Sequence, residues 1–142
     1  MIQLRLSEIA KAVNGELLGT DEIVNGSVET DSRLIKPGSI FIAKPGEMTD
    51  GHNFVEAAIS SGAVGVIVER KLDVLATQII VANSVEALGR LAQFVIARLH
   101  EAGRLKVIGI TGSNGKTSTK NMLRTVLQNF GNTIAPIESY NN

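Results

Sequence analysis

The chain has no cysteine, no excess of either charge and no apolar run long enough to cross a membrane. Without cysteine it forms no disulfide, thiolate zinc site or cysteine nucleophile. Basic and acidic residues balance at 14 each, which provides no basic field for nucleic acid or an anionic membrane. The first fifteen residues lack the basic and apolar regions of a signal peptide. We therefore expect a cytoplasmic monomer with small-molecule partners.

The remaining composition is that of an ordinary globular chain. Of its 142 residues, 44% are hydrophobic and 20% are charged, enough to bury a core. The length suits one domain, or a small domain with part of another.

Short apolar segments alternate with helical patterns along the chain. Helices are expected at 7–13, capped by Ser7, at 54–61, and at 84–99, capped by Ser84. Strands are expected at 16–18, 23–24, 27–30, 39–43, 64–68, 79–82 and 106–110, with Asn25-Gly26 as a candidate hairpin turn. This alternation predicts an α/β fold. A polar stretch around Gly103 predicts a domain boundary, dividing the chain into 1–103 and 104–142.

The glycine-rich stretch TGSNGKTS at 111–118 lies between the last predicted strand and an amphipathic helix. Its glycines allow main-chain N–H groups to turn toward an anion, and the helix directs its positive end at the same place. Lys116 is then placed to reach the β- and γ-phosphates of ATP, and the Thr117 hydroxyl to bind Mg²⁺. The residues expected to bind the nucleotide are Gly112, Ser113, Asn114, Gly115, Lys116, Thr117 and Ser118.

One position departs from the usual phosphate-loop pattern, because Ile110 stands where a first glycine is expected. The loop is therefore of the T-G-x-x-G-K-[ST] type, and a chance turn is a minor alternative. A nucleotide-binding sheet needs several units of about 30 residues each, and few residues follow the helix. We expect the second domain to be incomplete.

Two polar segments upstream are candidate binding sites. In Thr30-Asp31-Ser32-Arg33, the arginine can hold a phosphate or carboxylate; alternatively, Asp31 pairs with Arg33 or caps the turn. Gly46 and Asp50-Gly51-His52 form a second loop, in which the histidine is a turn residue, a satisfied surface histidine or a catalyst.

Together these segments resemble the Mur ligases of peptidoglycan synthesis. The resemblance rests on TDSR at 30–33, SIFIAKPGEMTDGHNF at 39–54, GAVGVIV at 62–68 and GITGSNGKTSTKNML at 109–123. It covers essentially the whole chain. The last segment is most similar to the members that add D-alanyl-D-alanine to UDP-N-acetylmuramoyl-tripeptide; members that add the third amino acid are the alternative.

The resemblance implies a fold and a mechanism. Residues 1–103 would be the N-terminal domain that binds the UDP part of the muramyl-peptide, and 104–142 the first strand, loop and helix of a truncated ATP-binding domain. In this family ATP phosphorylates the peptide carboxylate and an amine attacks the acyl phosphate. Lys116 would be the catalytic residue, with Thr117 on Mg²⁺ and Asn141 or Asn142 near the nucleotide. The implied UDP-site residues are Thr30, Asp31, Ser32, Arg33, Gly46 and His52.

The family's other metal ligands and its amine-substrate domain have no counterpart in these residues. We therefore expect the chain alone to lack ligase activity and to bind ATP weakly. Two other hypotheses are a non-catalytic UDP-binding module and part of an unrelated phosphate-loop kinase or ATPase.

Overall fold

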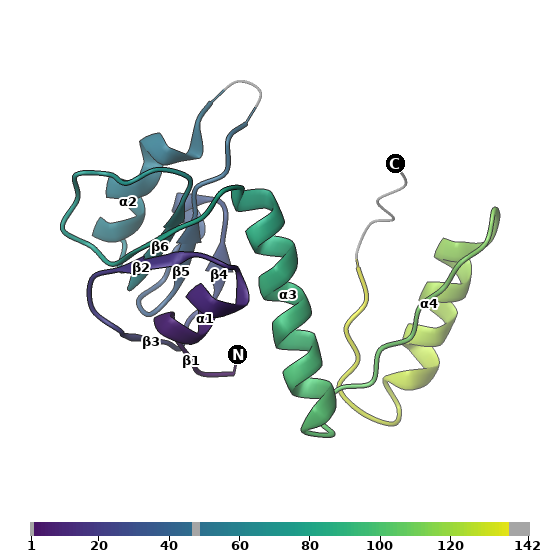
Figure 1. The fold of residues 1–142 in the computed structure, drawn as a ribbon. Coiled ribbons are helices and arrows are strands. Elements are labelled where there is room, and N and C mark those ends of the chain that lie inside the picture. The colour runs from purple at the N-terminus through teal and green to yellow at the C-terminus, as the bar shows by residue number, and fades with distance from the viewer. Residues whose placement is uncertain (1, 47–48, 137–142) are drawn as a thin grey trace. The chain divides into compact units, whose positions relative to one another are not determined.

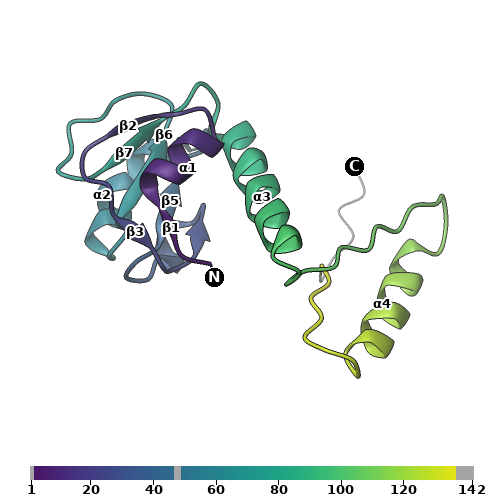
Figure 2. The same ribbon diagram turned by 60° about the horizontal axis from the view of Figure 1, so that its bottom comes forward.

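The computed structural model describes residues 2–46 and 49–136 and divides into two compact units, Met1–Leu105 and Lys106–Asn142 (Figure 1). The first unit contains a five-stranded sheet, of which Figure 2 labels β2, β5, β6 and β7. The strand order is β2-β7-β6-β5-β4. Its strands are β2 (Glu16–Leu18), β4 (Val28–Glu29), β5 (Ile40–Ile42), β6 (Gly65–Val68) and β7 (Gln78–Ile80). Strands β4 to β7 run parallel, and β2 pairs antiparallel with β7. The predicted α/β fold is confirmed.

Helices cover both faces of this sheet because successive strand residues point to opposite sides. In β5, Ile40 and Ile42 join the core beneath α1 (Leu6–Ala12) and α3 (Ser84–Glu101). Phe41, between them, joins the second core, beneath α2 (Val55–Ser60). Both faces of β5 and β6 are buried, which explains why these two parallel strands are continuously apolar.

Two short 3₁₀ helices follow strands β4 and β5 along the chain. They are η1 (Ser32–Leu34) and η2 (Gly51–Phe54), and both contact α2. Since β4 and β5 are parallel, η1 and η2 both lie toward the carboxyl edge of the sheet.

The predicted hairpin at Asn25-Gly26 is wrong. Strand β3 (Ile23–Val24) pairs with β1 (Leu4–Arg5) in a separate two-stranded sheet, whereas β4 pairs with β5. The N–H groups of Asn25 and Gly26 instead donate to the Gly38 carbonyl, at 3.2 and 2.8 Å. A local turn signal was overridden by pairing with more distant strands.

Both predicted serine caps are also wrong by one or two residues. Helix α1 starts at Leu6, and Ser7 inside it donates from its N–H and hydroxyl to Asp21, each at 2.9 Å. In α3 the cap is Asn83, whose side chain accepts from the Glu86 N–H at 2.8 Å. The neighbouring Ser84 is buried and pairs with Glu69 instead.

In the second unit, the amphipathic helix expected after the glycine-rich loop is α4 (Lys116–Leu127). The expected strand at 106–110 is not formed. A strand needs a neighbour to satisfy its backbone groups, and residues 106–136 contain no strand. In α4, Leu123 and Leu127 are half-buried, while Met122 and Val126 are exposed. Phe130, after the helix, is also exposed.

None of the helices within residues 2–46 and 49–136 combines the length and apolarity needed to cross a membrane.

Candidate functional site

The glycine-rich loop takes the backbone conformation that its glycines permit. Gly112 has a φ of 147° and Gly115 a φ of 76°, both in the region that favours glycine. Gly115 is the residue preceding α4, and its carbonyl accepts the helical bond from the Thr119 N–H at 2.9 Å. The first N–H groups of a twelve-residue helix therefore begin directly at the loop.

Lys116 folds back over this loop. Its Nζ donates to the Gly112 carbonyl oxygen at 2.6 Å, which closes the loop on itself. A lysine ammonium has three donors, so the same group can also contact a phosphate held beside the loop.

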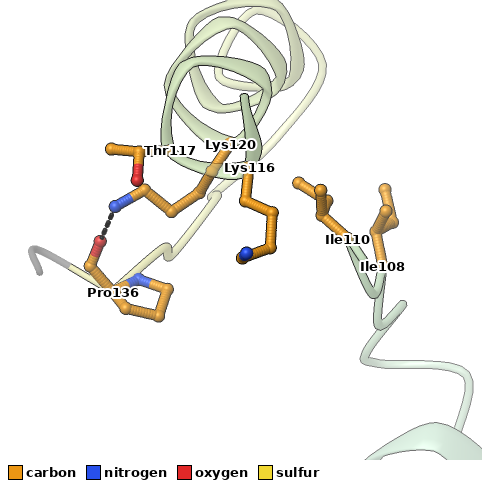
Figure 3. A pocket seen from close by; sticks show the side chains of 6 residues that line it. All are labelled: Ile108, Ile110, Lys116, Thr117, Lys120 and Pro136. Atoms are coloured by element: carbon orange, nitrogen blue, oxygen red, sulfur yellow. Dashed lines mark hydrogen bonds between the residues drawn. The ribbon is translucent and has the colours of Figure 1, made fainter. Parts of the chain in front are cut away.

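A pocket lies beside Lys116, within the second unit (Figure 3). Its volume is about 230 Å³, and it is lined by Ile108, Ile110, Lys116, Thr117, Lys120 and Pro136. Lys120 donates to the Pro136 carbonyl at 2.6 Å and so ties α4 to the segment that follows it. The sequence pattern did not single out Lys120, although it lies one helical turn beyond Lys116 on the same side of the helix.

Of the other predicted loop residues, Thr117 lines this pocket, and Ser113, Asn114 and Ser118 do not. Ser113, Asn114 and Ser118 are exposed, as is Thr117. Asn141 and Asn142 lie outside the described residues. No group of three or more His, Asp or Glu side chains within 2–46 and 49–136 is arranged to hold a metal ion.

In the first unit, Thr30 to Arg33 follow β4, as predicted. Asp31 caps η1 by accepting from the Arg33 N–H at 3.0 Å, and its carboxylate also accepts from the Arg33 Nε and Nη2. Asp31 therefore both pairs with Arg33 and caps the turn. These bonds, first from the guanidinium and then from the backbone, lower the pKa of Asp31 to about 2. The Arg33 side chain remains 86% exposed.

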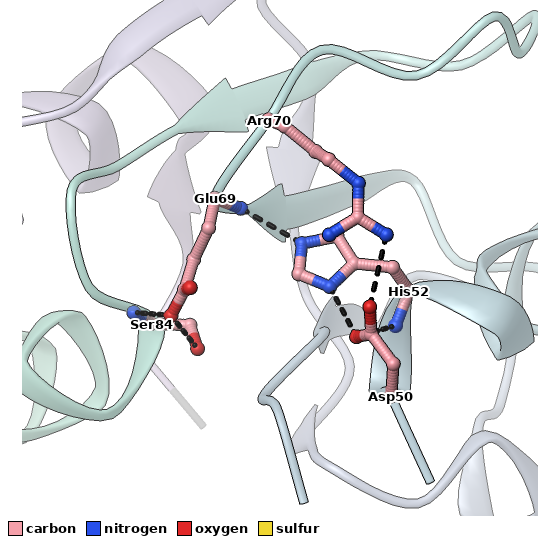
Figure 4. Close-up of polar contacts among 5 residues, drawn as sticks. All are labelled: Asp50, His52, Glu69, Arg70 and Ser84. Carbon is pink, nitrogen blue, oxygen red and sulfur yellow. Dashed lines mark hydrogen bonds and ion pairs between the residues drawn. The ribbon is translucent and has the colours of Figure 1, made fainter.

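His52 is not a surface histidine as one alternative held; it lies in a buried polar cluster after β5 (Figure 4). Its Nδ1 is 2.6 Å from Asp50 Oδ1, and its Nε2 accepts from the Glu69 N–H at 2.9 Å. Asp50 Oδ2 also accepts from Arg70 Nη2 at 2.9 Å. Glu69 in turn accepts from the N–H and hydroxyl of Ser84, each at 2.8 Å. Gly46 is exposed, and its N–H donates to the Thr49 carbonyl at 3.1 Å.

Sequence reasoning missed Glu69, Arg70 and Ser84 as members of this cluster. A signal was available, because Glu69 and Arg70 directly follow a fully apolar predicted strand. The carboxyl ends of parallel strands share one edge, and polar side chains there come together.

Asp50 makes the stability of the first unit depend on acidity. Bonds from the His52 backbone and ring, then from Arg70, hold the Asp50 pKa below its usual 3.8. A carboxyl whose pKa is lower in the folded than in the unfolded chain stabilises the fold at pH above its unfolded-state pKa. That contribution is lost as pH falls toward the folded-state pKa. We expect Asp50→Asn to lose less stability than wild type between pH 5 and pH 2, measured by urea unfolding. Replacing exposed Asp73 with Asn is the control. If the free energy of unfolding of both variants falls with pH as steeply as that of the wild type, Asp50 has no such role.

Two family models match the chain. The model described as Mur ligase family, catalytic domain, matches residues 26–97, half of the chain, and the Mur ligase middle domain matches residues 110–142. The chain belongs to the Mur ligase family. The resemblance carried by TDSR and the glycine-rich loop is thus confirmed.

Curated proteins and solved structures that resemble this Mur ligase chain are themselves Mur ligases. It is 39% identical to the UDP-N-acetylmuramoyl-tripeptide--D-alanyl-D-alanine ligase of Escherichia coli strain K12, over 100% of the chain and 30% of that protein. A crystal structure of MurF from Acinetobacter baumannii matches with a TM-score of 0.78 and 34% identity, covering 91% of the chain and 28% of that structure. MurF ligase from Thermotoga maritima in complex with ADP matches with a TM-score of 0.60 and 33% identity, covering 75% and 24%. The chain spans about 30% of the length of the curated relatives it matches.

Proposed function

We propose that this chain is the N-terminal part of an ATP-dependent ligase that adds D-alanyl-D-alanine to UDP-N-acetylmuramoyl-tripeptide in the cytoplasm. The observation that carries the proposal is the similarity over the whole chain to ligases named for that reaction. The fold supports it, since a sheet with polar carboxyl-edge loops precedes a glycine-rich loop and helix in one chain.

Residues 1–103 are proposed to bind the UDP part of the substrate, through Thr30 to Arg33 and the loop around Gly46. In open α/β sheets ligands bind outside the carboxyl ends of the strands, which is where these residues lie. Arg33 supports this role because its mostly exposed guanidinium is suited to phosphate.

Residues 104–142 are proposed to begin the ATP-binding domain, with Mg²⁺ held by Thr117. The positive φ angles of Gly112 and Gly115 and the closeness of Lys116 to the loop fit a bound phosphate. Bound ATP supplies the phosphoryl group that activates the peptide carboxylate. Lys116 would bind the phosphates and offset the charge that develops as this group leaves.

The chain by itself is proposed to be inactive as a ligase and monomeric. Within residues 106–136 the loop has no sheet beside it, and the described residues hold no cluster of acidic and histidine ligands. A lone loop without its sheet is less preorganised for its ligand. Substrate binding is then the property that the first unit retains.

Separate calorimetric titrations test this proposal. We expect the 142-residue chain to bind UDP-N-acetylmuramoyl-tripeptide, to bind Mg-ATP more weakly, and to release no ADP when D-alanyl-D-alanine is added to both. Tighter binding of the muramyl-dipeptide than of the tripeptide would favour the ligase that adds the third amino acid. Failure to bind any UDP-linked muramyl-peptide would contradict the proposal.

A further inference from the structure

The polar cluster around His52 leaves this ring no free nitrogen for a ligand (Figure 4). The His52 side chain is only 2% exposed. Because Nε2 accepts from the Glu69 N–H, the proton is on Nδ1, which donates to Asp50 Oδ1. His52 is therefore neutral and fixed in one tautomer, so any effect it has on a ligand must pass through a neighbour.

That neighbour is Asp50, whose two oxygens face different partners. Oδ1 accepts hydrogen bonds from the His52 ring and, at 3.0 Å, from the His52 backbone N–H. Oδ2 accepts a hydrogen bond from Arg70 Nη2. The ring thus sets the orientation of the carboxylate, and the carboxylate sets that of the guanidinium.

One side of the Arg70 guanidinium is hydrogen-bonded to Asp50, and the rest of the side chain is largely exposed to solvent. Its side chain is 57% exposed, and the bond to Asp50 uses one of five guanidinium N–H donors. Planar guanidinium donors match the oxygens of phosphate in pairs, and an orientation fixed in advance reduces the entropy lost on binding.

The position of Arg70 repeats that of Arg33. Each arginine follows a parallel strand of the sheet, Arg33 after β4 and Arg70 after β6, and each is paired with an aspartate. The segments that hold the two aspartates, η1 and η2, both contact α2. Two carboxylate-oriented cations therefore lie along one edge of the sheet, where ligands of open α/β sheets bind.

We propose that Arg70 binds the diphosphate of the UDP-linked substrate together with Arg33, and that Asp50 and His52 are positioning residues that orient Arg70. This rests on the proposed function and changes the role predicted for His52. The histidine does not touch the ligand; it fixes the carboxylate that presents the second cation.

The first experiment measures affinity of the 142-residue chain for UDP and for UDP-N-acetylmuramoyl-tripeptide by calorimetry. Arg70→Gln is expected to weaken both by about tenfold, the effect of losing one charged hydrogen bond. Arg90→Gln is the matched control, since Arg90 also pairs with a carboxylate, that of Glu86, but within α3. It should leave both affinities unchanged.

Three outcomes would contradict the proposal. Wild-type affinity of Arg70→Gln for UDP overturns it while leaving the proposed function intact. If Arg70→Gln loses affinity only for UDP-N-acetylmuramoyl-tripeptide and not for UDP, Arg70 binds a peptide carboxylate, and the diphosphate assignment is overturned. Absence of UDP binding by the wild type contradicts the proposed function, and this inference with it.

A double-mutant cycle tests the positioning role of His52. The side chain introduced by His52→Gln can still accept from the Glu69 N–H but lacks the Nδ1 donor to Asp50. We expect His52→Gln to weaken UDP binding several-fold in the wild-type background and to have no further effect in Arg70→Gln. A purely structural role would give the same loss in both backgrounds and would overturn the assignment.

Discussion

Replacing Lys116 with alanine is expected to weaken binding of Mg-ATP by the chain about 10- to 100-fold, the effect of one or two charged hydrogen bonds. The Lys116 ammonium donates to the Gly112 carbonyl, and Lys116 lines the pocket beside the loop, as Lys120 also does. We therefore expect Lys116 to contact a phosphate held there. Because wild-type affinity is itself expected to be weak, the titration is best followed by NMR shifts of the Gly112 and Gly115 amides.

Lys106→Ala is the control for this experiment. Lys106 is an exposed lysine of the same unit that precedes the loop and does not line the pocket. Its removal changes the net charge by the same amount, so a nonspecific electrostatic effect would weaken both variants equally. Equal losses, or no loss in Lys116→Ala, would show that Lys116 does not bind the nucleotide.

Replacing Phe41 with alanine is expected to lower the free energy of unfolding of the first unit by about 3–5 kcal/mol. Phe41 is 1% exposed in β5, which lies between β6 and β4 in the sheet, and it packs in the core between the sheet and α2. Small domains are stable by only about 5–15 kcal/mol, so this loss would leave the unit close to unfolding. Urea unfolding followed by far-UV circular dichroism measures it, since the chain has no tryptophan and one tyrosine.

Phe54→Ala provides the comparison within the same unit. Phe54 is 43% exposed at the end of η2, so the same truncation removes less buried surface there. We expect a loss of about 1 kcal/mol. Similar losses for both variants would mean that β5 and its cover by α2 are not the core of this unit.

The predictions from sequence succeeded where a local pattern is enough. Strands β5 and β6 are short apolar runs, and α3 repeats apolar residues at helical spacing; each was placed within two residues. The start of α4 at Lys116 follows from glycine before it and an amphipathic run after it. Such signals need only neighbours in the chain.

The errors arose where distant segments compete with a local signal. Asn25-Gly26 is a good turn pair, but β3 and β4 found partners in different sheets. Residues 106–110 have the apolar pattern of a strand, but no strand lies beside them within 106–136. Serine is a common helix cap, yet the N–H and hydroxyl of Ser84 both donate to the Glu69 carboxylate.

The sequence by itself determined the α/β class, the family and the phosphate-loop motif, because each is encoded by residue types at fixed spacing. The tertiary structure alone showed that His52 is buried with both ring nitrogens hydrogen-bonded, and that Arg70 lies against Asp50. Those outcomes depend on contacts between the ends of strands that are adjacent in the sheet but separated in the chain, as Asp50 and Arg70 are. A ligand site at the edge of a parallel sheet is assembled by strand order, which spacing along the chain does not specify.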